Sequence, residues 1–454
     1  MHGVKRLPKN AATAEARAAR KAKEAAKLEA YLEIERTFFT HKREGRKDAT
    51  ALEHTTKLLT LNPELYTVWN YRRQILLHLF ASSEGEHGVE AEAGAKPDVF
   101  ASLRDVRPAA DKAETDVADE GADEREARWS RNRALLEDDL MLTEHALRAH
   151  PKVYWIWNHR RWCLTQNPPP PPSTAAAASS TSTSEQWVWE RELKLVEKML
   201  DLDPRNFHGW NWRRAIVEHL ALSLLSSHSS TAPLAATQPS FPALLSHPSF
   251  LAADVETQRG ALLTLAEREL AYALRKIESN FSNFSAWHQR TKLLPHVWAA
   301  QRLTAAEVDA RIDAELELVK QAMYTDPSDQ SVWFYHRWLV EQLFPAPTTT
   351  TTEAETIPQQ QEQEAQEGRR ARQLRVLHDE IAVIDELFEL EPDSKWCAIS
   401  LAHYHMLLAG LHAGEAAEAE ACRAKADSLL HRLVELDPDR QARYRDLLDG
   451  RAHF

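Results

Sequence analysis

The stretch Asp326-Pro-Ser-Asp-Gln-Ser-Val-Trp333-Phe-Tyr-His336-Arg337-Trp338 is the clearest copy of a unit that recurs along this sequence. Asp-Pro or Asn-Pro ends one helix, because proline lacks the N–H and clashes with the preceding turn, and proline suits the start of the next helix. Each unit therefore predicts a helix, a tight turn and a second helix. Further copies lie at 62–73, 151–161, 203–214 and 280–290, a degenerate one at 391–396, and a remnant at 437–444.

The second helix of each unit carries a stripe of tryptophan, a cationic residue and an aliphatic residue at spacing i, i+3, i+7, which is one face of an α-helix. We expect the tryptophan to pack between neighbouring helices and the cation to stack on it or to pair with a carboxylate. These positions are therefore predicted to be structural. They are Trp69, Arg72, Trp157, Arg160, Trp210, Arg213, Trp287, Arg290, Trp333, His336 and Arg337.

Stacked hairpins predict a single all-α repeat domain over residues 1–454. Residues 1–28 are rich in Ala, Lys, Arg and Glu and predict a solvated basic helix. Four stretches with few large apolar residues predict disordered inserts, at about 81–126, 167–184, 223–253 and 345–367. Each insert follows the second helix of a hairpin, so all should fall on one edge of the stack. The opposite edge, made of the tight turns, is the expected place for functional contacts.

Composition narrows the function further. The net charge of −12 argues against a general nucleic-acid binder. Cys163, Cys397 and Cys422 form no CxxC pair and no disulfide framework, which indicates a reducing compartment such as the cytoplasm. No paired His or Asp is apparent around them, so we expect no metal site in this chain. No apolar run approaches the length of a transmembrane helix.

The signature Pro-x5-Trp-x2-Arg resembles the protein prenyltransferase α-subunit repeat, over nearly the whole chain outside the inserts. Tetratricopeptide repeats are also helical hairpins, but their period of about 34 residues is shorter and regular. The segments 205–214, 280–288 and 324–338, with the opening Met1-His2-Gly3, are most similar to the Rab-type (type II) geranylgeranyltransferase branch of that family.

The resemblance implies a right-handed α–α superhelix, a crescent wrapped around a β subunit that holds zinc and most of the lipid pocket. It implies transfer of geranylgeranyl from geranylgeranyl diphosphate to C-terminal cysteines of Rab GTPases presented by Rab escort protein. Two alternatives stay open. One is an α subunit shared by farnesyltransferase and geranylgeranyltransferase type I, and the other is a helical-repeat scaffold with no enzyme.

The resemblance also assigns candidate site residues. Lys152 and Tyr154 align with a lysine and a tyrosine that reach the isoprenoid diphosphate in the family's shared active site. A cation and a hydroxyl donor suit charge that builds on a leaving diphosphate. Trp155 stands where the CaaX-type subunits carry a glutamine, which favours a Rab-type substrate. His208 and Phe207 are expected to face the shared cleft, and His2 is a possible reversible ligand of the partner's zinc.

The acidic insert at 81–126 yields a first test. Its composition predicts no packed core, and it belongs to the edge away from the tight turns. Replacing it with a short Gly/Ser linker should leave the melting temperature of the complex nearly unchanged in a thermal shift assay. A drop of many degrees would show that the insert is structural.

Overall fold

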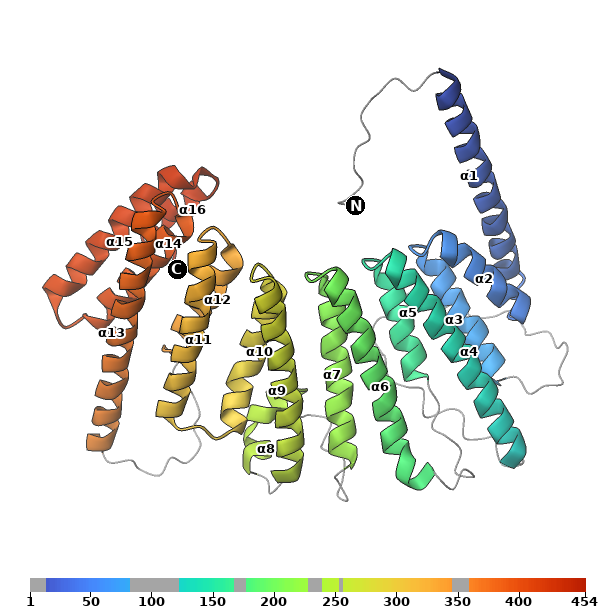
Figure 1. Cartoon of the computed structure of the whole chain (residues 1–454), viewed down its shortest axis with the longest axis horizontal. Coiled ribbons are helices and arrows are strands. Elements are labelled where there is room, and N and C mark those ends of the chain that lie inside the picture. The colour runs from blue at the N-terminus through green and yellow to red at the C-terminus, as the bar shows by residue number, and fades with distance from the viewer. Residues whose placement is uncertain (1–13, 82–121, 167–176, 228–238, 253–255, 345–358) are drawn as a thin grey trace. The chain divides into compact units, whose positions relative to one another are not determined.

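The computed structural model describes residues 14–81, 122–166, 177–227, 239–252, 256–344 and 359–454, and this part of the chain is helical without any strand (Figure 1). The chain divides into two compact units, residues 1–216 and 217–454, and each is described by itself. In both units consecutive helices pair as antiparallel hairpins joined by short turns. The predicted all-α class and helical-hairpin repeat are therefore confirmed. Within the described residues no helix is long and apolar enough to cross a membrane.

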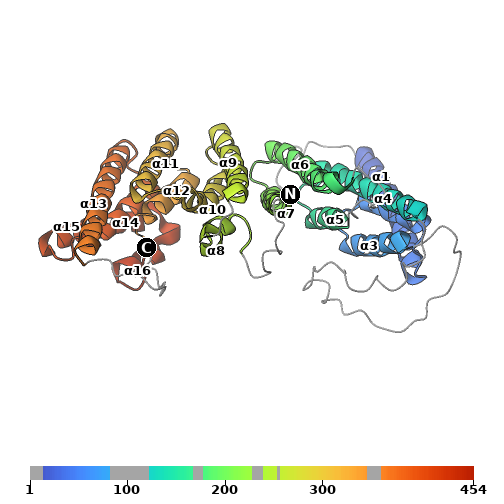
Figure 2. The same ribbon diagram turned by 90° about the horizontal axis from the view of Figure 1, so that it is seen from below.

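The first unit holds α1 to α6 and the start of α7. Their bounds are α1 Ala14–Arg43, α2 Ala49–Leu61, α3 Tyr66–Ala81, α4 Ala122–Ala149, α5 Tyr154–Thr165, α6 Ala177–Leu202 and α7 Phe207–Ser227. The hairpins are α2 with α3, α4 with α5, and α6 with α7. Figure 2 shows α4 and α6 in one layer and α3 and α5 in the other.

The second unit continues the same pattern. Its elements after α7 are η2 Ala243–Ser246, α8 Pro248–Ala252, α9 Glu256–Ser279, α10 Phe284–Ala300, α11 Ala305–Thr325, α12 Gln330–Glu341, α13 Gln359–Leu390, α14 Lys395–Leu411, α15 Ala416–Leu436, η3 Pro438–Arg440 and α16 Gln441–Leu448. The first helices α9, α11 and α13 form one layer, and α10, α12 and α14 form the other (Figure 2).

The repeat tryptophan fastens the tight turn of its own hairpin. Its indole N–H donates to the backbone carbonyl six residues earlier, which belongs to the turn proline or, in the fourth unit, to Phe281. Because the indole is otherwise buried, this bond satisfies its only polar group and fixes the proline-to-tryptophan spacing. The five bonds are Trp69 to Pro63 (2.9 Å), Trp157 to Pro151 (2.9 Å), Trp210 to Pro204 (2.8 Å), Trp287 to Phe281 (2.7 Å) and Trp333 to Pro327 (2.9 Å).

The arginine three residues later joins one hairpin to the next. Arg160 on α5 is buried and forms a bidentate pair with Glu192 on α6, at 2.7 Å from Nε and 2.5 Å from Nη2. It also donates to the Leu140 carbonyl and the Thr143 hydroxyl of α4, its own first helix. One guanidinium therefore holds three helices, and all of its polar partners lie in the interior.

The same link recurs between other hairpins. Arg72 pairs with Asp139 of the next hairpin and donates to the Leu52 carbonyl of its own. Arg290 pairs with Glu315 and donates to the Leu270 carbonyl. In the fifth unit His336 replaces the arginine and bonds Glu380 at 2.9 Å and the Tyr404 hydroxyl at 2.6 Å. Arg72, Arg160, Arg290 and His336 are buried, whereas Arg337 is half-buried and stands beside the linking position. The interpretation of these positions as structural stays a prediction, which the interior bonds of the four buried residues support.

The insert boundaries need correction. Residues 122–126, 177–184, 223–227 and 359–367 lie in helices, as parts of α4, α6, α7 and α13. In 122–126 and 359–367 the reason is the content of Ala, Gln and Glu, which are strong helix formers. In the third insert Leu244, Leu245 and Phe250 are buried, so the Ser/Pro-rich stretch contributes a short packed segment. The other predicted insert residues lie outside the described part of the chain. The linker replacement should accordingly remove 82–121 and keep α4 complete.

Residues 16–30 of α1 are exposed throughout, as expected for a solvated N-terminal helix.

The remnant of a seventh unit, residues 437–444, forms a hydrogen bond in the structure. The buried Tyr444 hydroxyl donates to Asp437 at 2.8 Å, so the last helices close the second unit by a short polar anchor.

The Arg160–Glu192 link predicts a large effect on stability. Arg160→Met leaves a carboxylate buried without its cation, so the free energy of unfolding should fall by about 3–5 kcal/mol. The double change Arg160→Met/Glu192→Leu removes both charges and should recover most of that loss. Urea unfolding of the wild type, the single variants Arg160→Met and Glu192→Leu, and the double variant measures this. A double variant that is as unstable as the sum of its single changes would contradict it.

Candidate functional site

The second tight turn presents the two candidate catalytic residues to solvent. It runs from the end of α4 at Ala149 to the start of α5 at Tyr154. The Lys152 side chain is 72% exposed and Tyr154 is 54% exposed, so neither belongs to the core. Both side chains are long, carry a polar group at the tip and lie at the start of a helix. They are therefore available for contact with another molecule.

The third tight turn, between Leu202 at the end of α6 and Phe207 at the start of α7, is hydrogen-bonded to the second. Asn206 is buried, and its Oδ1 accepts the His208 N–H at 3.0 Å, which caps the start of α7. Its amide nitrogen donates to the Pro151 carbonyl of the second turn at 3.1 Å. Gly209 allows close packing here, since a Cβ would stand 2.9 Å from Cδ2 of Leu200 on α6 and would force that side chain to shift. The two turns are thus fixed relative to one another.

The four predicted site residues lie together on these two turns. The His208 ring is 5.8 Å from the Tyr154 ring and 3.8 Å from the Phe207 ring. Burial lowers the pKa of His208, while a hydrogen bond to the Lys152 backbone works in the opposite direction. The Lys152 ammonium lies 3.2 Å from a carboxylate oxygen of Asp203, a residue that the sequence argument did not single out. A cation, a phenol and an imidazole therefore share one exposed edge.

Aromatic side chains continue along this edge in the first unit. Tyr66 is 51% exposed and stacks at 5.3 Å on Trp155, which in turn contacts Tyr154 at 5.6 Å. Phe207 is 68% exposed. In the second unit the exposed rings of Phe284 and Phe334 lie 6.2 Å apart, and Phe334 contacts the buried Trp396 at 5.6 Å. Exposed aromatic rows of this kind are typical of protein contact surfaces.

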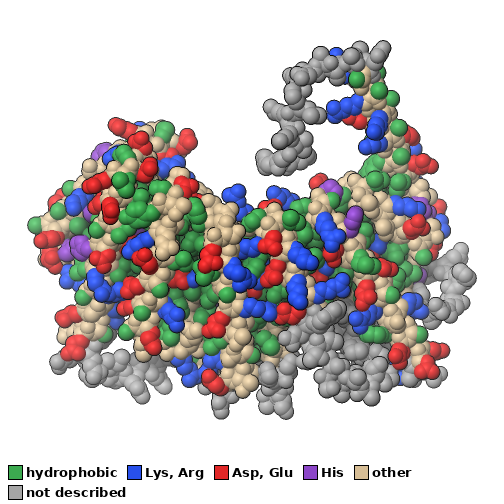
Figure 3. All heavy atoms as spheres, viewed as in Figure 1, with side chains coloured by type: hydrophobic (Ala, Val, Ile, Leu, Met, Phe, Trp, Pro, Cys, Tyr) green, Lys and Arg blue, Asp and Glu red, His purple; other side chains and the backbone are tan. Residues whose placement is uncertain are grey.

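The charged side chains give the surface no single sign. Figure 3 shows Lys and Arg interspersed with Asp and Glu over the face in view. The two cavities with defined linings lie elsewhere, around the hairpin links of Arg160 and Arg72. The candidate site is accordingly an open edge rather than a pocket. Chemistry that requires exclusion of water would need a second surface laid against it.

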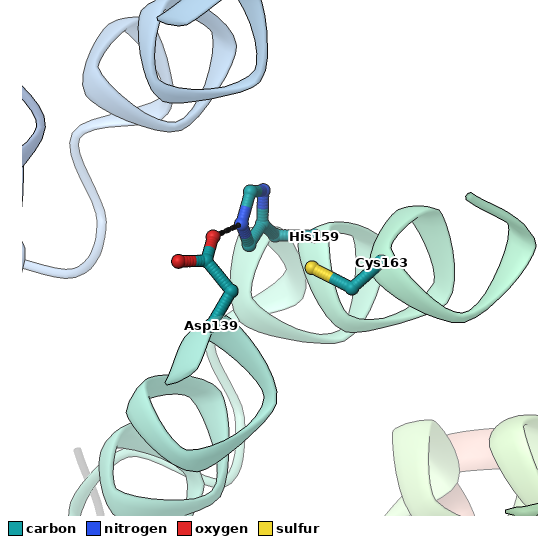
Figure 4. A group of neighbouring side chains, drawn as sticks. All are labelled: Asp139, His159 and Cys163. Carbon is teal, nitrogen blue, oxygen red and sulfur yellow. Dashed lines mark hydrogen bonds and ion pairs between the residues drawn. The ribbon is translucent and has the colours of Figure 1, made fainter. Parts of the chain in front are cut away.

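One buried cluster was missed by the sequence argument. Asp139, His159 and Cys163 bring three potential ligand atoms within 4.8 Å of one another (Figure 4). The expectation that Cys163 has no paired His or Asp is therefore wrong. His159 lies one helical turn before Cys163 on α5, a spacing that was visible in the sequence, whereas Asp139 arrives from α4 through the hairpin.

The donor set of this cluster does not fit zinc. His159 Nε2 donates to Asp139 at 2.7 Å, and Arg72 occupies both oxygens of the same carboxylate. Burial lowers the pKa of His159 to about 4 and raises that of the Cys163 thiol, so the ring is neutral and the thiol keeps its proton. Arg73 lies 3.4 Å from the other ring nitrogen. A cation would face two guanidinium groups and a protonated thiol, and the cluster acts as an interior hydrogen-bond network.

His2, the remaining metal-related candidate, lies outside the described residues. Among the described residues the functional candidates are therefore Lys152, Tyr154, Phe207 and His208, together with Asp203 and the aromatic row.

Comparison with known proteins gives consistent relatives. A family model described as the protein prenyltransferase alpha subunit repeat matches residues 48–79, 136–167, 189–220, 266–297 and 312–343. The chain is 30% identical to the geranylgeranyl transferase type-2 subunit alpha of Schizosaccharomyces pombe, over 98% of this chain and 97% of that protein. The identity is 26% to the subunit of the same name from Candida albicans, over 99% and 98%.

A solved structure, Candida albicans protein geranylgeranyltransferase-I complexed with GGPP, is similar with a TM-score of 0.46 and 17% identity, over 92% of this chain and 89% of that chain.

The thiol environment yields a test of the cluster. Cys163 and Cys397 are buried, and burial raises the pKa of both, that of Cys397 to about 11, whereas Cys422 is half-buried. Since the thiolate is the reactive form, iodoacetamide at pH 8 should label Cys422 and spare the other two in the native protein. Peptide mass spectrometry reads the labelling, with urea-unfolded protein as the control. Native labelling of Cys163 as fast as Cys422 would contradict the assignment.

Proposed function

The chain belongs to the family of geranylgeranyl transferase type-2 alpha subunits, and from this premise we propose that it acts as the alpha subunit of a heterodimeric Rab geranylgeranyltransferase. The enzyme would transfer geranylgeranyl from geranylgeranyl diphosphate to C-terminal cysteines of Rab GTPases presented by Rab escort protein, in the cytoplasm. The observation that carries the proposal is the near full-length match, combined with the placement of Lys152 and Tyr154 on one exposed edge.

The beta subunit is the partner that the open edge fits. Tyr66, Tyr154 and Phe207 remain about half or more exposed at the starts of three consecutive second helices. Covering them with a partner surface removes apolar area from water and at the same time encloses Lys152. The family resemblance implies a catalytic zinc held by the partner. That zinc would bind and activate the thiolate of the acceptor cysteine.

The residues of this chain would act on the departure of the diphosphate, whereas the zinc would act on the acceptor thiolate. In the transfer, the bond between the prenyl carbon and the diphosphate oxygen breaks, a carbon–sulfur bond forms, and diphosphate leaves. Negative charge grows on the leaving oxygen as this bond breaks. The Lys152 ammonium and the Tyr154 hydroxyl are donors suited to that charge, and the partner's own basic groups would share the binding of the diphosphate.

A subunit shared by farnesyltransferase and geranylgeranyltransferase type I is the alternative within the family. Trp155 contacts the rings of Tyr66 and Tyr154, and its side chain offers no amide for a peptide carboxylate, which supports the Rab-type acceptor. Co-expression with the candidate beta subunit, followed by transfer assays with and without escort protein, separates the two. Transfer to a CaaX peptide without escort protein would overturn the Rab assignment. The chain purified alone is the control and should be inactive.

Lys152 carries the sharpest prediction for the proposed function. Lys152→Ala should lower the single-turnover rate of the heterodimer by about ten- to a hundredfold, because one donor to the developing charge is lost. Tyr154→Phe should act in the same direction and more weakly. Affinity for isoprenoid diphosphate and subunit association should change little.

Lys395 provides a matched control for this measurement. It starts α14 in the second unit, and its ammonium lies 3.3 Å from Asp437 of the following turn, much as Lys152 faces Asp203. Lys395→Ala should leave the transfer rate within about twofold of wild type, since Lys395 and Asp437 belong to the last hairpins of the second unit and not to the candidate site. If the Lys152→Ala variant had the same rate as this control, Lys152 would be an ordinary surface lysine with no role in the transfer.

A further inference from the structure

We propose that Asp203 is a positioning residue for Lys152: its carboxylate, carried by the third tight turn, holds the ammonium of the second turn where it meets the leaving anion. The inference rests on the proposed function, because it names a second residue that acts at the same site. Asp203 lies outside the Trp–Arg stripe and is not among the site residues that the sequence predicts.

The first support is the direct contact. The Lys152 nitrogen lies 3.2 Å from Asp203 Oδ2, and the two side chains are 72% and 31% exposed. A lysine side chain has four rotatable bonds, and at this exposure it would otherwise sample many positions. The carboxylate restricts the ammonium to the gap between two turns. An ion pair this exposed is weak, so an incoming diphosphate can share or displace it.

The second support is that Asp203 gives up the usual role of its position. In three other units the residue before the turn proline, or before Phe281, accepts the backbone N–H two residues later. These bonds are Asn62 to Glu64 (3.2 Å), Asn280 to Ser282 (3.0 Å) and Asp326 to Ser328 (3.0 Å). In the described structure Asp203 makes no such bond to Arg205, and its carboxylate turns to Lys152 of the preceding hairpin instead.

The third support is the rigidity of the surrounding frame. The Asn206 amide donates to the Pro151 carbonyl at 3.1 Å. The backbone of the second turn, next to Lys152, is thus fixed by the third turn. Asp203 adds the one contact that fixes the side-chain end of Lys152. The third turn accordingly holds the backbone beside Lys152 and the end of its side chain.

The test uses the co-expressed heterodimer and single-turnover transfer. Asp203→Asn is compatible with the turn, because asparagine occupies the same position at Asn62 and Asn280. Since an exposed ion pair gives at most about a fivefold preference, Asp203→Asn should lower the rate about three- to fivefold, and Asp203→Glu should restore part of it. Thermal stability and subunit association should stay at wild-type values.

A double-mutant cycle distinguishes positioning from a structural effect. If Asp203 acts through Lys152, Asp203→Asn should cause no further loss in the Lys152→Ala background. Asp326→Asn is the matched control, since it makes the same change at the same turn position without a lysine partner, and it should leave the rate unchanged.

The outcomes separate the inference from the proposed function. An additive loss in the double variant, or an Asp203→Asn rate at or above wild type, would overturn the positioning role while Lys152→Ala still lowers transfer. A heterodimer without transfer activity, or with an unaffected Lys152→Ala rate, would instead overturn the proposed function on which the inference depends.

Discussion

Three of the buried arginines that follow a repeat tryptophan, Arg72, Arg160 and Arg290, each bond two hairpins at once. Arg160 donates to the carbonyl of Leu140 in its own hairpin and forms a bidentate pair with Glu192 in the next. Guanidinium suits this task because its planar fork carries five donors and keeps its charge in the interior. The cost of removing the charges from water is offset only when every donor has a partner. Stacking of the hairpins within each unit therefore depends on this one contact being complete.

The tryptophan complements the arginine on the same helix face. Its indole N–H closes the tight turn through the carbonyl six residues earlier, and its rings fill the space between helices. Turn and stack are thus fixed by two residues three positions apart. The residues at the start of each second helix therefore are not needed to close the turn or to join the hairpins. Tyr66, Tyr154 and Phe207 stand in these positions and are exposed, which gives the edge its capacity to bind a partner.

The geometry of the candidate site is also set by the contacts that join one hairpin to the next. Because the second and third hairpins are locked by Arg160 and Glu192, their turns are held side by side at the edge. Asn206, His208 and Asp203 then act from one turn on the residues of the other. A rigid scaffold with an exposed, pre-positioned cation suits a reaction in which charge develops on a leaving group. Water exclusion is left to whatever surface covers the edge.

Sequence alone determined the hairpin repeat, the buried Trp–Arg stripe and the family, because these follow from local spacing: proline and tryptophan six apart, arginine three further on. It also named Lys152, Tyr154, Phe207 and His208 as candidates, and the structure places them on two neighbouring tight turns. The tertiary structure alone decided the partners. Asp139, Glu192 and Glu315 each lie eighteen residues before the tryptophan of their own unit, yet each pairs with the arginine of the unit before. Asp203 likewise meets Lys152 only across two hairpins. Contacts of this kind depend on how neighbouring hairpins stack. The spacing of residues within a single unit gives no information about this stacking.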